Sequence, residues 1–163
     1  MTHPKNQSIV TEWINNRFGV NLNDQDLSSI KDFSLIWNVF EDVVCSNNFS
    51  IAAAEVQILT KQLNLQDFQN NLDYFKNRYI ENGSINQRFG LLHFRNNDRE
   101  EFVRQVLLGN TTDIHQIVLA ITIIVYRFRN NLFHGMKDIR VIDQQRDNFQ
   151  HANSFLTTLL NYF

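Results

Sequence analysis

Apolar side chains at helical spacing between residues 112 and 134 constrain the fold more than any other feature of the sequence. At about 100° per residue they share one face of a single long helix. That face consists of Ile114, Val118, Ile121, Val125, Phe128 and Leu132. Thr111 or Thr112 is expected to cap the N-terminus of this helix, and Gly135 is expected to end it.

Six other segments have the apolar period or the flanking residues of helices. They are residues 8–18, Ser28 or Ser29 to about Cys45, Ile51 to about Leu63, 66–80, Asp98 to Gly109, and about Gln144 to Tyr162. Ser50 and Asp98 are the expected N-caps of the third and fifth of these helices. Residues 84–97 have no clear period, and we expect an ordered loop that packs on the helices.

The fold class follows from these helices and from the scarcity of residues that break them. The 163 residues include one proline and five glycines, and no segment alternates with period two for long enough to predict a strand. A chain of this length can bury one substantial core. The sequence therefore predicts an all-α fold, a single bundle of five to seven helices. It would form one domain over residues 1–163, with its core motif region at 113–137.

Charge and cysteine content exclude several classes of protein. The formal net charge of -2 argues against a general nucleic-acid coat protein, which would be basic overall. Cys45 is the single cysteine, so the chain has no internal disulfide, and we expect Cys45 to be a small buried hydrophobe. His93, His115 and His151 lack the spacing of zinc ligands. Neither a metal nor another cofactor is therefore predicted.

Location is predicted from two further observations. The first residues have no apolar segment typical of a secretory signal. The longest apolar run, Ile117 to Val125, is about half the length of a membrane span. We expect a cytoplasmic protein without a membrane partner.

The C-terminal half of the long helix concentrates polar residues that can carry chemistry. On a helical wheel Asn130 and His134 stack one turn apart, with Arg127 beside them and Arg129 between them and the apolar face. Ile123 and Tyr126 also lie off the apolar face, so we expect a second buried side of the helix at a subunit interface. The polar patch would then lie at the edge of a dimer contact.

Each polar residue of this patch also has an ordinary structural interpretation. A histidine before a glycine at a helix end interacts favourably with the helix dipole. The asparagines can bond to carbonyls or water, and the arginines can form a solvated face. Together, however, they predict an electropositive site with one titratable group and no acid near it. Such a site suits phosphodiester chemistry, because histidine transfers protons near neutral pH and arginine holds phosphate.

The segment Arg129-Asn130-Asn131-Leu132-Phe133-His134 resembles a motif of HEPN domains. That motif consists of an arginine, a polar residue, three variable residues and a histidine. HEPN domains are α-helical bundles, and many are metal-independent endoribonucleases that act as dimers with a shared cleft. The resemblance implies that Arg129 and His134 are the catalytic pair and that Asn130 orients them. Arg127, Asn131 and Lys137 are further residues expected to bind the substrate. Glu41, on the earlier helix, is expected either to support the site as an acid or to form a surface ion pair.

The resemblance also implies a function. The expected activity is cleavage of RNA by attack of the 2′-hydroxyl, which leaves a 2′,3′-cyclic phosphate and a 5′-hydroxyl. The expected setting is a bacterial toxin–antitoxin or antiphage system, with an antitoxin or other inhibitory protein as partner. The alternative is a HEPN module without catalysis, which binds a nucleotide, an RNA phosphate or a partner protein.

Overall fold

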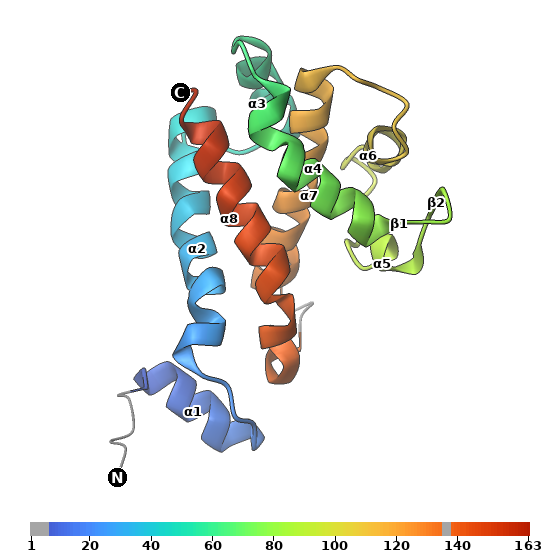
Figure 1. The fold of residues 1–163 in the computed structure, drawn as a ribbon. Coiled ribbons are helices and arrows are strands. Elements are labelled where there is room, and N and C mark those ends of the chain that lie inside the picture. Colours follow the sequence, from blue (N-terminus) through green and yellow to red (C-terminus); the bar gives the residue numbers. More distant parts are fainter. Residues whose placement is uncertain (1–6, 135–137) are drawn as a thin grey trace.

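Helices account for nearly all regular structure in the computed structural model, which describes residues 7–134 and 138–163 (Figure 1). The α-helices are α1 (Ile9–Phe18), α2 (Asp24–Cys45), α3 (Ile51–Leu59), α4 (Leu65–Tyr79), α5 (Gln87–Gly90), α6 (Glu100–Leu107), α7 (Ile114–Phe133) and α8 (Arg146–Leu160). A 3-10 helix, η1 (Ile139–Gln145), precedes α8. The all-α prediction is confirmed. The described residues form one α-helix more than the five to seven expected, because residues 84–97 contain the single turn α5.

A small antiparallel hairpin was not predicted. Strands β1 (Ile80–Glu81) and β2 (Ser84–Ile85) pair Ile80 with Ile85, and the turn between them places Gly83 at φ 77°. Two-residue strands are too short to show a period of two in the sequence. The hairpin connects α4 to α5 at one side of the bundle (Figure 1).

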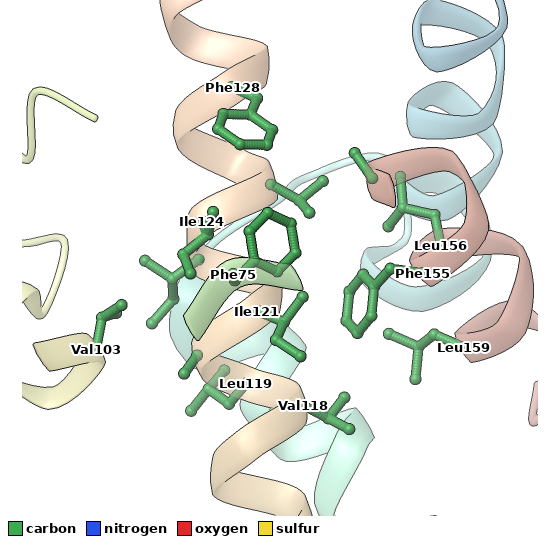
Figure 2. Close-up of a cluster of buried hydrophobic side chains, with 14 of the residues drawn as sticks. Phe75, Val103, Val118, Leu119, Ile121, Ile124, Phe128, Phe155, Leu156 and Leu159 are labelled. Atoms are coloured by element: carbon green, nitrogen blue, oxygen red, sulfur yellow. The ribbon is translucent and has the colours of Figure 1, made fainter. Parts of the chain in front are cut away.

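The helix α7 is the centre of the core. The helices α2 and α8 run side by side along one side of the bundle, and α4 crosses α7 (Figure 1). Figure 2 shows side chains of α7, including Ile121 and Phe128, beside Phe75 of α4 and Phe155 of α8. All four are buried, as expected for the apolar face of the long helix.

Three expected helix boundaries were wrong. Asn23, rather than Ser28 or Ser29, caps α2, because its side-chain oxygen accepts a hydrogen bond from the Asp26 amide at 2.7 Å. Asp113, rather than a preceding threonine, caps α7 in the same way. Asp98 does not cap α6; it is buried, and Arg99 occupies the cap position. The expected cap at Ser50 is confirmed.

The helix α1 packs on the rest of the chain through its polar side. The Thr11 hydroxyl donates to Asp24 at 2.6 Å, and Asn15 exchanges two hydrogen bonds of 2.8 Å with the backbone of Leu22. The apolar stripe of this helix is left mostly exposed, including Trp13. Hydrogen bonds therefore place α1 across the end of the bundle more than apolar burial does.

A histidine stack between α4 and α8 makes the stability of the fold dependent on pH. The rings of His151 and Tyr74 lie 3.7 Å apart and nearly parallel, and burial lowers the pKa of His151 from 6.5, against a smaller opposing effect of Asp147. Below about pH 6.5 the unfolded chain therefore binds a proton at this position more readily than the folded chain. The free energy of unfolding should fall as the pH drops below this value, and this group should have no effect above it.

Urea denaturation between pH 4.5 and 8 measures this contribution. His151→Phe retains an aromatic ring for the stack but cannot titrate, so it should flatten the decline below pH 6.5. His93→Asn, at an exposed position in a turn, is the matched control and should leave the decline unchanged. An identical decline in wild type and His151→Phe would show that the stack does not couple to pH.

Candidate active site at the C-terminal end of α7

An aromatic cluster fixes the direction of α7 just before the motif. The Tyr126 ring lies 4.4 Å from that of Phe49 and 6.0 Å from that of Trp37. Glu41 belongs to this cluster: it accepts a hydrogen bond of 3.0 Å from the Trp37 indole and one of 3.4 Å from the Phe49 amide. Its carboxylate therefore orients the α2–α3 connection. The expected role as a supporting acid has no support, because Glu41 has no contact with Arg129 or His134 among the described residues.

The second buried side of α7 is covered by the chain itself. Ile123 is fully buried, and α6 and α3 pack along the helix. Tyr126 lies in the intramolecular aromatic cluster. The expectation of a subunit interface on this side of α7 was therefore wrong. A dimer through another surface stays a prediction.

Arg127 is a structural residue. Its side chain is buried, with 2% of the residue exposed, and its Nη1 donates to Asp98 Oδ2 at 2.9 Å. Nε donates to the Leu92 carbonyl at 3.1 Å, and Nη2 lies 3.5 Å from Asn131 Oδ1. Burial lowers the pKa of Arg127, while Asp98 opposes that shift. The prediction that Arg127 lies in an exposed patch without a nearby acid was wrong.

Asn131 also holds the fold together. Its side-chain amide donates to the carbonyls of Leu91 and Leu92 at 3.3 and 3.1 Å, and the residue is buried. Asp98 Oδ2, the acceptor of Arg127, also accepts from the backbone amide of Arg95 at 2.7 Å. These bonds fasten residues 91–98, which include the end of the segment 84–97 expected to be an ordered loop, to the side of α7. Neither Arg127 nor Asn131 has a free polar group on the surface where substrate was expected.

Arg129 differs from Arg127 in both partner and exposure. It is half-buried, and its Nη1 donates to the side-chain oxygen of Asn130 at 3.0 Å. Its guanidinium lies 5.3 Å from the centre of the Phe133 ring, which is 57% exposed. Its Nε is buried without a hydrogen-bond partner, and no carboxylate within the described ranges pairs with it. Arg129 therefore has a positive charge that no described carboxylate neutralises, while its unpaired Nε–H is itself buried.

Asn130 and His134 complete the site at the end of the helix. Asn130 is buried, and its side-chain oxygen accepts the hydrogen bond from Arg129. His134 is exposed and occupies the C-cap position, where its backbone amide donates to the Asn130 carbonyl at 2.9 Å. Among the described residues no hydrogen bond joins the side chains of Arg129 and His134. Lys137, expected to contact substrate, lies outside the described residues, as does Gly135.

Two residues of this region were not identified from the sequence. Asp98 lies 29 positions before Arg127, and nothing local indicates that they pair. Phe133 was treated as a variable position of the motif, although an exposed aromatic residue one position before the histidine could have indicated a contact surface.

The described residues do not gather metal ligands. No group of three or more His, Cys, Asp or Glu side chains lies close enough within residues 7–134 and 138–163 to hold a metal ion. Cys45 is buried, and burial together with the nearby Glu41 raises the pKa of its thiol to about 11. This thiol is therefore unsuited to act as a nucleophile near neutral pH.

Within the described part of the chain, every helix is too short or too polar to span a lipid bilayer.

Comparison of the chain with protein-family models, with curated proteins and with solved structures gives no match.

Proposed function

We propose that this protein is a metal-independent endoribonuclease of the HEPN type, with its active site at Arg129, Asn130 and His134. The observation that carries the proposal is the state of Arg129: a half-buried guanidinium, positioned by Asn130 and free of any described carboxylate partner. An arginine with this freedom can hold a phosphate bidentately and stabilise added negative charge. His134 is exposed on the same helix end, where a substrate can reach it.

RNA supplies the nucleophile for this reaction. The 2′-oxygen forms a bond to phosphorus while the bond from phosphorus to the 5′-oxygen of the next nucleotide breaks. A base removes the proton of the 2′-hydroxyl, and an acid protonates the departing 5′-oxygen. The products are a 2′,3′-cyclic phosphate and a 5′-hydroxyl. His134 is the base or the acid, and Arg129 stabilises the charge that develops on the phosphoryl oxygens.

A second copy of the chain suits this chemistry. One imidazole cannot serve as base and acid at the same moment, and the described end of α7 contributes a single histidine. In a dimer with a shared cleft, His134 of each subunit could take one of the two roles. We place the reaction in the cytoplasm, in a toxin–antitoxin or antiphage system with an inhibitory partner protein; this setting rests on the resemblance to HEPN domains.

A second function has support from Phe133. An exposed ring beside an arginine is a suitable platform for stacking a nucleobase while the guanidinium contacts a phosphate. The same site would then bind a nucleotide or single-stranded RNA without cleaving it. Calorimetry with nucleotides and short RNAs distinguishes the two functions, since binding without turnover supports a binding module.

The requirement for a 2′-hydroxyl provides the test of the reaction type. The purified protein should cleave an RNA oligonucleotide in the presence of EDTA and leave the DNA oligonucleotide of the same sequence intact. The new RNA ends should be 2′,3′-cyclic phosphate and 5′-hydroxyl, which mass spectrometry identifies. Loss of cleavage in EDTA, cleavage of the DNA, or 5′-phosphate ends would each exclude the proposed reaction.

A further inference from the structure

The outer face of α2 has an apolar stripe that the described chain leaves uncovered. Leu35, Val39 and Val43 recur at intervals of four residues and are 68%, 47% and 50% exposed. At this spacing they lie one above another along one side of the helix. A row of aliphatic side chains of this kind is the usual contact surface for the apolar face of another helix.

The charges around this stripe are mostly negative. The helix α2 contains five carboxylates and a single lysine. Three of the carboxylates have partners within the chain: Asp24 pairs with Lys31, Asp26 pairs with Arg146, and Glu41 accepts from Trp37. Asp32 and Asp42 have no cationic partner among the described residues, and both are exposed. Asp32 lies one turn before Leu35, and Asp42 lies one turn after Val39.

A groove between α2 and α8 extends the stripe. It has a volume of about 340 Å³ and is lined by Asp32, Leu35, Ile36 and Val39 of α2 and by Asn153 and Thr157 of α8. The Asn153 amide nitrogen donates to the Ser29 carbonyl, whereas its side-chain oxygen has no partner. The groove thus combines aliphatic walls with the exposed carboxylate of Asp32, whereas the unpaired oxygen of Asn153 is buried. The groove is matched to side chains with aliphatic stems and cationic ends, such as lysine and arginine.

A second copy of the chain is a poor occupant of this face. In a symmetric contact through α2, Asp32 and Asp42 of both copies would enter one interface. Lys31, the one cation of this helix, is already paired with Asp24 at 3.0 Å. Like charges brought together in an interface oppose association. The negative charge on this face of α2 therefore favours a positively charged partner.

We propose that the stripe Leu35–Val39–Val43 and the groove between α2 and α8 are a docking site for a basic amphipathic helix of a partner protein. The apolar face of that helix would cover the stripe, and its lysine or arginine side chains would meet Asp32 and Asp42. The site belongs to the outer face of α2 and is independent of the proposed nuclease activity.

A designed peptide tests the site without knowledge of the natural partner. The probe is a helical peptide of about 18 residues, five turns, with leucine on one face and lysine on the other. Its affinity is measured by fluorescence anisotropy, and its position by amide shifts in the NMR spectrum of the labelled protein. The lysine peptide should bind with shifts confined to α2 and α8. A peptide with glutamate in place of lysine should bind at least tenfold more weakly.

Matched variants distinguish binding to the apolar stripe from nonspecific electrostatic attraction. Leu35→Ser with Val39→Ser should weaken binding tenfold or more without a change of charge. The same exchange at Val56 and Leu59, which are 60% exposed on α3, should change the affinity less than twofold. Asp32→Asn with Asp42→Asn should weaken binding severalfold and reduce its dependence on salt.

Three results would overturn the proposal. The first is failure of the lysine peptide to bind, and the second is equal loss of affinity from the α2 and α3 variants. The third concerns the oligomeric state. If light scattering detects a dimer that Leu35→Ser with Val39→Ser dissociates, the stripe is covered by a second copy of this chain.

Discussion

Replacing Arg127 with methionine is expected to lower the free energy of unfolding by about 3–5 kcal/mol, because it leaves the buried carboxylate of Asp98 without its cation. The substitution also removes the donors to Leu92 and Asn131, so residues 91–98 lose part of their attachment to α7. Urea denaturation followed by circular dichroism at pH 7 measures the change.

Arg104 provides a matched control for this prediction. Its pair with Glu100 has the same separation of 2.9 Å, but both side chains are more than a third exposed. Arg104→Met should therefore cost about 1 kcal/mol or less. A double-mutant cycle with Asp98→Asn should show strong coupling to Arg127→Met, since each change alone leaves a buried group unpaired. Equal losses from Arg127→Met and Arg104→Met would contradict the structural role of Arg127.

Replacing His134 with alanine is expected to reduce RNA cleavage by about 10²–10⁴-fold, the usual contribution of a general acid or base. Arg129→Met should reduce it by about 10²–10³-fold, the usual effect of removing one donor to a developing charge. Arg129→Lys should restore only part of the activity, because lysine cannot hold phosphate bidentately. Initial rates with the RNA oligonucleotide in EDTA measure all three variants.

His93→Asn is the control for the histidine, since His93 is exposed and lies outside the proposed site at Arg129, Asn130 and His134. It should cleave RNA at the rate of wild type. If His134→Ala retains the wild-type rate, the cleavage comes from a contaminant or from another site, and the proposed role of His134 fails. If no variant and no wild-type protein cleaves, nucleotide binding that depends on Arg129 would support the binding module instead.

The sequence predicted those parts of the fold that depend on local pattern. The apolar period of α4 and of α7, and the serine cap of α3, involve residues within a few positions of one another. Boundaries were less accurate. Asn23, five residues before Ser28, accepts from a free amide of α2, and Asp113, one residue after Thr112, accepts from a free amide of α7. The hairpin and the turn α5 have too few residues to show any period.

The candidate site shows where sequence reasoning failed. A helical wheel places Arg127 opposite the apolar face and thus predicts a solvated arginine. In the folded chain that side of α7 is covered by residues 91–98, and Asp98 enters from a loop 29 positions away. Arg129, placed beside the apolar face, is the partly exposed arginine, and no carboxylate of the described residues pairs with it. A helical wheel cannot distinguish the environments of Arg127 and Arg129, because the segment that buries Arg127 is distant in the sequence.

We propose that Arg127 and Arg129, two positions apart on one helix, have different roles: Arg127 stabilises the fold, and Arg129 acts on the substrate. The most direct measurement determines both the free energy of unfolding and the rate of RNA cleavage in EDTA for Arg127→Met and Arg129→Met. We predict a large loss of stability for the first variant. For the second we predict a stability within about 1 kcal/mol of wild type and a loss of cleavage of at least 10²-fold. A stable Arg129→Met that cleaves RNA at the wild-type rate would contradict the proposed role of Arg129.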